Sequence, residues 1–349
     1  MAACMRRKLF RNSGQFLRGY FGESGLSCKV QRCSCSSKSF DSNKGTSKLF
    51  LSDEVQSILK RITGMDLSKV FRHTKEKLEA PTYRLVSDAK LKELEEEAKK
   101  TAAKRLQMPP VMEERTEVNE VLSENPELEG LESSKFVFTD ITYGLSDRER
   151  FIVVREPNGV LRKAKGEERD RILQIYFPRS QRQLVPPPLF ADEHLQGTFD
   201  GDRHEYLLDA ACVQFEPDAK DFIRIHHKTY DDIDAKENYN LLRSTRHFGG
   251  LAFYLSRKQQ IDGLLVDMIK RHLISDAVDL VHLMHLMTPD CPSAVEVQSN
   301  KLEGIDVLKV FIEKDAKQKG LLELALQSYE NDVANQESDT EEQVSDSQR

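Results

Sequence analysis

The chain has 349 residues, of which 52 are Lys or Arg and 58 are Asp or Glu, giving a formal net charge of −6. No apolar run approaches the roughly 18 residues of a membrane-spanning helix, which argues against a membrane-spanning protein. The charge is uneven, because residues 1–48 hold ten basic and two acidic side chains and the remainder holds 42 and 56. The resulting charges of +8 and −14 argue against a body coated with nucleic acid over its whole surface.

The basic segment, residues 1–48, has the composition of a mitochondrial transit peptide. It has no acidic residue before Glu23 and is rich in Arg and Ser. At about 100° per residue, Arg7, Arg11 and Arg18 share one side of a helix, and apolar side chains fall opposite them. We therefore predict a cleaved matrix-targeting segment, with a basic tail that binds nucleic acid as the alternative.

Removing that segment takes four of the six cysteines with it and leaves Cys212 and Cys291. Two lone cysteines cannot form a disulfide framework, which fits a reducing compartment. We expect both to be inert thiols.

Residues 49–134 are predicted to form an N-terminal helical segment and a linker. A short helix over 52–64 has an apolar stripe and a capping residue at its start, and Gly64 ends it. A highly charged helix over 87–106 follows and stops before a pair of prolines. Residues 112–134 are acidic and weakly patterned, which indicates a linker or short helical turns.

Residues 135–177 are predicted to form a small β-meander closed by one helix. The segment 135–143 alternates and is rich in β-branched and aromatic residues, which predicts a strand. A second strand is expected at 151–154 and, after a turn at 157–159, a third at 160–162. A helix is expected from Glu167 to about Tyr176.

The Pro-rich stretch over 178–202 is predicted to be a stiff extension, either reaching outward or lying as a surface loop.

Residues 203–329 are predicted to form a C-terminal helical domain, and the acidic tail 330–349 is expected to be disordered. One apolar series steps by four and three residues, as a helix-packing seam does. These candidates for a protein interface are Leu241, Thr245, Phe248, Ala252 and Leu255. The fold class is thus α+β and mostly α.

Candidates for catalysis or metal binding are weak. His282 and His285 share a helical face, but apolar residues surround them and no further ligand stands at suitable spacing, so packing histidines are favoured. His226-His227-Lys228 resembles a surface patch or one that faces RNA. Gly249-Gly250 matches no phosphate-binding motif and suggests close approach of another backbone. The sequence predicts no enzyme, no cofactor and no metal.

Basic side chains are the better functional candidates, because each could contact a phosphate. One group is Lys69, Arg72, His73, Lys75 and Lys77. The groups that we favour for RNA contact are Arg162, Lys163 and Lys165, then Arg179 and Arg182 on the extension, and Arg243 and Arg246.

Long strings of the sequence resemble a known family. They include Asp53-Glu-Val-Gln-Ser-Ile-Leu59, Phe136-Val-Phe-Thr-Asp140, Arg148-Glu-Arg-Phe-Ile-Val-Val-Arg-Glu-Pro157, His226-His-Lys-Thr-Tyr230 and Leu242-Arg-Ser-Thr-Arg246. From about residue 50 to 329 the chain is similar to the mitochondrion-specific family of small-subunit ribosomal protein number 22.

The resemblance implies a structural constituent of the mitochondrial small ribosomal subunit, in the matrix, that supports subunit assembly and mitochondrial translation. It implies small-subunit rRNA and other ribosomal proteins as partners, with no membrane, no small-molecule substrate, no cofactor and no catalytic site. Two alternatives stay open. One is a free helical adaptor of the matrix that binds proteins or RNA transiently, and the other is an enzyme supported only by the histidines.

Overall fold

The computed structural model describes residues 45–72, 83, 85–131 and 133–346. Most of the predicted transit peptide therefore lies outside the described residues. So do His73, Lys75 and Lys77 of the first basic group.

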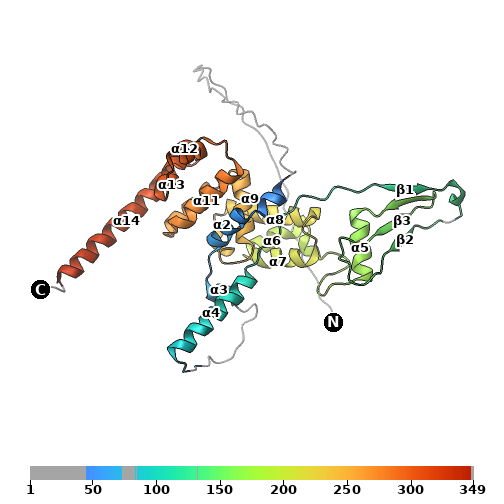
Figure 1. Ribbon diagram of the computed structural model, residues 1–349, viewed down its shortest axis with the longest axis horizontal. Helices are drawn as coiled ribbons and strands as arrows, with labels where there is room; N and C mark the ends of the chain where they lie inside the picture. Colours follow the sequence, from blue (N-terminus) through green and yellow to red (C-terminus); the bar gives the residue numbers. More distant parts are fainter. Residues whose placement is uncertain (1–44, 73–82, 84, 132, 347–349) are drawn as a thin grey trace, which may run out of the picture. The chain divides into compact units, whose positions relative to one another are not determined.

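The secondary structure is mostly helical, with one small sheet (Figure 1). The N-terminal helices are α1 (Thr46–Phe50), α2 (Asp53–Thr63), α3 (Leu67–Val70) and α4 (Asp88–Arg105). The sheet region holds β1 (Val121–Glu124), β2 (Phe136–Thr139), β3 (Ile152–Arg155), β4 (Val160–Lys163) and α5 (Gly166–Tyr176). The remaining helices are α6 (Asp192–Asp200), α7 (His204–Gln214), α8 (Lys220–Ala235), α9 (Phe248–Lys258), α10 (Asp262–Lys270), α11 (Ile274–Met287), α12 (Pro292–Asn300), α13 (Ile305–Lys314) and α14 (Lys319–Asp346). Short 3₁₀ turns are η1 (Pro126–Leu128), η2 (Pro188–Phe190) and η3 (Tyr239–Leu241).

This composition confirms the predicted α+β, mostly α class and its order of helices, strands and helices. None of the helices that the structure describes is both long and apolar enough to cross a membrane.

Helix α2 begins and ends as its sequence predicts. The Ser52 hydroxyl accepts a hydrogen bond from the backbone N–H of Val55 at 3.4 Å, which satisfies one of the free donors of the first turn. Gly64 follows the last turn with φ of 68°, a left-handed conformation that favours glycine.

The main hydrophobic core joins the N-terminal helices to the C-terminal half of the chain. Leu59 and Ile62 of α2 are fully buried in one cluster with Phe248, Leu251 and residues as distant as Leu326. Helix α2 packs against α9 and α11, and Arg61 donates two hydrogen bonds to Asp279 of α11 at 2.7 and 2.8 Å. The stretch 49–134 therefore contributes its first helices to the same core as 203–329.

The sheet has four antiparallel strands in the order β1-β4-β3-β2. The prediction of three strands missed β1, which lies within the stretch interpreted as a linker. All four residues of β1 are exposed. Because β1 buries neither face, nothing requires the alternation of apolar and polar residues that marks a half-buried strand. Strand β1 is held by backbone pairing with β4, as in Glu124 opposite Val160.

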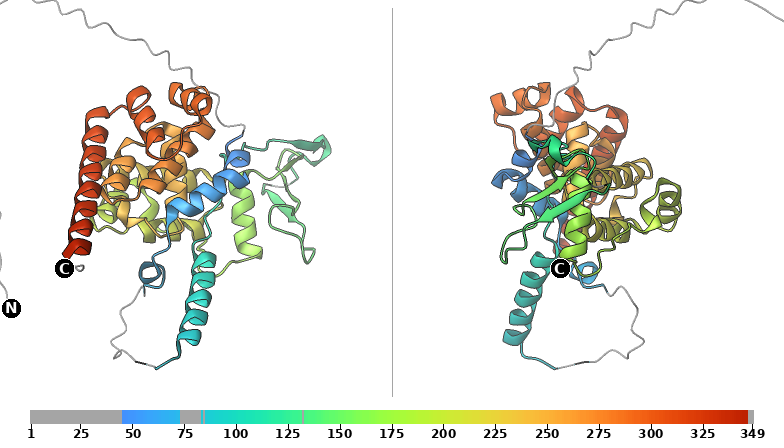
Figure 2. Two further views of the ribbon diagram at one scale, coloured as in Figure 1. Left: turned by 60° about the vertical axis from the view of Figure 1, so that its left-hand side comes forward. Right: turned by 90° about the vertical axis from the view of Figure 1, so that its right-hand side faces the viewer.

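Helix α5 covers one face of the sheet and leaves the other face open (Figure 2). Ile152, Val154 and Ala164 pack under α5 against Ile172 and Leu173. Val153 lies between Ile152 and Val154 in β3, so its side chain points to the other face. Cross-strand partners share a face, and Phe138 of the edge strand β2 pairs with Val153. Phe138 and Phe136, two positions earlier, therefore lie on that open face. Phe136 is 41% exposed and Phe138 is 51% exposed.

The Pro-rich stretch 178–202 is not a free extension. It contains η2 and α6, and Phe190 is buried with its ring 5.0 Å from that of Phe215. The apolar residues that follow the prolines dock the segment onto the helical body, which the proline pattern alone did not reveal.

The predicted packing seam is buried inside the chain itself. Thr245, Phe248, Ala252 and Leu255 are 5% exposed or less, and Leu241 lies in η3 rather than in α9, which begins at Phe248. The spacing reflected intramolecular packing, so these five residues do not form an exposed surface for another protein.

The acidic end of the chain also differs from its prediction, because α14 continues to Asp346. Glu and Gln are good helix formers, so a helix can continue through acidic sequence that lacks an apolar face.

Candidate functional site

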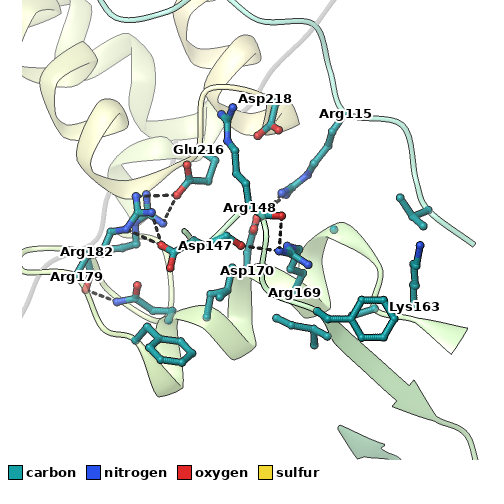
Figure 3. Close-up of a pocket in the computed structure, with 18 of the residues that line it drawn as sticks. Arg115, Asp147, Arg148, Lys163, Arg169, Asp170, Arg179, Arg182, Glu216 and Asp218 are labelled. Carbon is teal, nitrogen blue, oxygen red and sulfur yellow. Dashed lines mark hydrogen bonds and ion pairs between the residues drawn. The ribbon is translucent and has the colours of Figure 1, made fainter. Parts of the chain in front are cut away.

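Charged side chains gather where the sheet region meets the ends of α5 and α7. They line a cavity of about 380 Å³, and we call this group of ten the charged junction (Figure 3). Its members are Arg115, Asp147, Arg148, Lys163, Arg169, Asp170, Arg179, Arg182, Glu216 and Asp218. Six are basic and four acidic, so the lining carries an excess of two positive charges.

Arg115 ties the segment that leads to β1 onto α5. Its guanidinium donates to both carboxylate oxygens of Asp170, one at 3.0 Å, and its backbone N–H donates to the carbonyl of Asp218 at 3.1 Å. Such a two-point contact fixes orientation as well as distance. The hydrogen bond to Asp170 raises the pKa of Arg115 despite the opposing effect of burial.

Arg179 and Arg182 tie the end of α5 to the loop between α7 and α8. Both place a guanidinium nitrogen 2.9 Å from one oxygen of Glu216, and Arg179 also donates to Asp147. Arg182 further donates to the carbonyl of Val213 at 3.0 Å. These two candidates for RNA contact therefore bind carboxylates of their own chain.

Arg162, a third candidate, lies outside the cavity in the interior between the sheet and α5. It is 6% exposed and donates to Glu156 at 2.6 Å and to Glu168 at 2.8 and 2.9 Å. The hydrogen bond from Arg162 lowers the pKa of Glu168 to about 2, against the opposing effect of burial. With its donors so engaged, Arg162 has a structural role in joining the sheet to α5.

The other four candidates are spread over the molecule. Lys163 pairs with Glu120 at 2.6 Å, whereas Lys165 is exposed and its ammonium group makes no ion pair within the described ranges. Arg243 is partly buried between Asp267 and Asp276, with its guanidinium 5.1 Å above the Phe248 ring. Arg246 binds Asp209. The structure therefore does not bring the seven candidates into one surface.

Sequence reasoning missed the acidic half of the junction, since Asp147, Asp170 and Glu216 lie in unremarkable charged stretches. It also passed over Arg148 and Arg171, which are exposed and make no ion pair in the part of the chain that the structure describes. Nothing in the local sequence separates these free cations from paired ones.

The histidines are mostly interior. The Nε2 atom of His285 lies 2.8 Å from the Ser293 hydroxyl, in a buried contact that fits a packing role. His226 is buried as well, contrary to the predicted surface patch, and its ring lies near Cys212 and His247. Of the described residues, these three alone form a group that could hold a metal ion.

The glycine pair in α9 makes room for side chains rather than for another backbone. A Cβ on Gly249 would lie 2.0 Å from the sulfur of Met108, and one on Gly250 would lie 2.7 Å from the Tyr230 hydroxyl oxygen. The close approach was predicted correctly, but not its partner.

The fold and the charged junction define a mostly helical α+β protein whose charged side chains largely hold its own parts together. A family described as "Mitochondrial 28S ribosomal protein S22" matches residues 48–289. The chain is 51% identical over 284 residues to the small ribosomal subunit protein mS22 of Mus musculus, covering 81% of this chain and 79% of the relative. It is 49% identical over 296 residues to mS22 of Bos taurus, covering 85% and 82%. The chain belongs to the mitochondrial 28S ribosomal protein S22 family.

Proposed function

We propose that the chain, a structural constituent of the mitochondrial small ribosomal subunit in the matrix, acts without a catalytic step through contacts with small-subunit rRNA and neighbouring ribosomal proteins. The observation that carries this proposal is family membership across residues 48–289. The charged junction supports it, because three of its four carboxylates, those of Asp147, Asp170 and Glu216, pair with guanidinium groups instead of standing as free acids or bases.

Gradient sedimentation of mitochondrial lysate tests the assignment. The protein should migrate with the small subunit and its rRNA, and its depletion should lower the level of that rRNA. A free adaptor would instead remain at the top of the gradient beside intact subunits, and its depletion would leave the rRNA unchanged.

For RNA contact the free cations are better placed than the paired ones. Lys165, Arg171 and Lys220 are exposed, line a second cavity of about 690 Å³ and make no ion pair among the described residues. A cation without a carboxylate partner loses no internal ion pair when it binds a phosphate. We therefore propose that these three cations, and not the carboxylates that share the lining, contact rRNA phosphates on this surface.

Reversal of two charges tests that surface. The double variant Lys165→Glu/Arg171→Glu should reduce incorporation into the subunit and make it more sensitive to salt. Lys99→Glu/Lys100→Glu on α4 is the matched control, because both lysines are exposed and unpaired in the described part of the chain. Equal incorporation of the two double variants would refute the assignment.

For protein contact, the open face of the sheet takes the place of the buried seam. Strand β2 lies at the edge of the sheet, and its exposed aromatic residues supply apolar area beside unpaired backbone groups. Phe138→Asp should therefore weaken incorporation without lowering the free energy of unfolding. Tyr143→Asp, in the exposed loop that follows, is the control, and loss of incorporation in that variant alone would count against β2.

A further inference from the structure

Three side chains that can bind a metal come together from three separate elements. Cys212 lies on α7, His226 on α8 and His247 directly before α9, and their ligand atoms all lie within 4.8 Å of one another. His226 is 7% exposed and His247 is 1% exposed, while Cys212 is partly buried. The group is separate from the charged junction.

The hydrogen bond of His226 leaves one of its nitrogens free. Its Nδ1 lies 2.8 Å from the carbonyl oxygen of Phe222. A carbonyl can only accept, so Nδ1 carries the hydrogen and Nε2 keeps its lone pair. That Nε2 atom is buried and has no hydrogen-bond partner within the described chain.

His247 repeats this arrangement with a carboxylate. Its Nε2 lies 2.8 Å from an oxygen of Asp209. An ionised carboxylate can only accept, so Nε2 is the donor. The Nδ1 atom is then the lone-pair nitrogen, and it too is buried with no partner among the described residues. Histidines that bind metals are held in this way, with the second ring nitrogen donating to a carboxylate or a backbone carbonyl.

The protonation of the three groups is compatible with metal binding. Burial lowers the pKa of His226 to about 3 and also lowers that of His247, so both rings are neutral near pH 7. Burial raises the pKa of the Cys212 thiol to about 11, so the thiol keeps its proton until a cation displaces it.

We propose that Cys212, His226 and His247 bind one Zn²⁺ ion, with a water molecule as the fourth ligand. Thiolate and imidazole are preferred zinc ligands, with bonds of about 2.3 and 2.0 Å that place ligand atoms roughly 3.3–3.6 Å apart in a tetrahedron. The group therefore closes by about 1 Å when the ion enters. Binding releases one proton, from Cys212 to solvent, and joins α7, α8 and the start of α9 through the ion.

Co²⁺ and Zn²⁺ titrations of the purified full chain test this site. Cys4, Cys28, Cys33 and Cys35 lie outside the described residues, and replacing them with Ser leaves two thiols to follow. We expect one Co²⁺ per chain with a thiolate-to-cobalt charge-transfer band that Zn²⁺ abolishes. Zn²⁺ should also raise the melting temperature and protect Cys212, but not Cys291, from alkylation, as mapped by mass spectrometry.

The variants separate the site from general stability. In that background Cys212→Ser should lose the charge-transfer band, and Asp209→Asn should weaken Co²⁺ binding about tenfold or more. Cys291→Ser, a second partly buried cysteine, should keep the band. The proposal is wrong if the chain with both Cys212 and Cys291 shows no charge-transfer band with Co²⁺, or if Zn²⁺ leaves Cys212 as reactive as Cys291. Neither result depends on whether the Cys212 or Asp209 variant folds.

Discussion

At the residue scale, the guanidinium of Arg162 joins the sheet to helix α5. Arg162 is buried between Glu156 and Glu168, so its removal takes the ion-pair partner from Glu168 and leaves Glu156 with Lys135 alone, at 3.1 Å. Breaking a buried ion pair by deleting one partner costs far more than the pair itself contributes.

Arg162→Ala should therefore lower the free energy of unfolding by about 3 kcal/mol. Arg171→Ala, which removes an exposed arginine from the same helix α5, should change it by less than about 0.5 kcal/mol. Urea denaturation of both variants measures the difference, and similar values would contradict the structural role of Arg162.

His285 gives the molecule a pH dependence of known sign. Burial and then the charge of His282 lower its pKa from 6.5 to about 4, while Asp315 opposes them. Between these values the unfolded chain binds more protons, so the free energy of unfolding falls as the pH drops from about 6.5 to about 4.

His285→Gln should remove this part of the pH dependence, which we expect to be about 1–3 kcal/mol after allowance for screening by solvent. Urea denaturation of the wild type and the variant at several pH values measures it. Parallel curves for the two proteins would show that His285 does not contribute.

At the element scale, the turn between β3 and β4 depends on one glycine. Gly159 has φ of 81°, and a Cβ there would lie 2.0 Å from the carbonyl oxygen of Asn125. Asn125 also donates its backbone N–H to Gly159 at 3.2 Å, so this turn anchors the chain just beyond β1.

Gly159→Ala should destabilise the protein more than Gly144→Ala does. Gly144 has a similar φ of 86° but nothing within 4 Å of the added carbon, so it reports the conformational cost alone. We expect an excess of about 1–3 kcal/mol from the clash, measured by urea denaturation. Equal decreases in the free energy of unfolding for the two variants would mean that the turn relieves the clash by a small shift of its backbone.

The elements that could be predicted are those with local signals. Ser52 and Gly64 bound helix α2, and β-branched residues mark β3, so both follow from a few neighbouring residues. Strand β1 has no such signal, because backbone pairing with a strand about 40 residues later determines it. The grouping of Cys212, His226 and His247 likewise depends on packing between distant helices.

At the scale of the whole molecule, one carboxylate connects the sheet region to the helical body. Glu216 pairs with both Arg179 and Arg182, so its loss removes one ion pair from each guanidinium and leaves Arg179 bound to Asp147 and Arg182 bound to the carbonyl of Val213.

Glu216→Gln should raise the rate of hydrogen exchange around residues 174–183 while leaving the exchange of α9 and α11 unchanged. Glu193→Gln, at an exposed position of α6 without an ion pair in the described ranges, is the control. A uniform rise across the helical core would instead indicate general destabilisation.

The pairing of α2 with α9 and α11 has a consequence for how the chain folds. Residues near position 60 meet residues near 250 and 280, so the sheet region and α3–α8 form a loop of about 190 residues between the two sides of one contact. The core cannot be completed until the second half of the chain is present, and contacts this distant in sequence slow folding. Until then α2 exposes its apolar stripe, which makes the incompletely folded chain prone to aggregation.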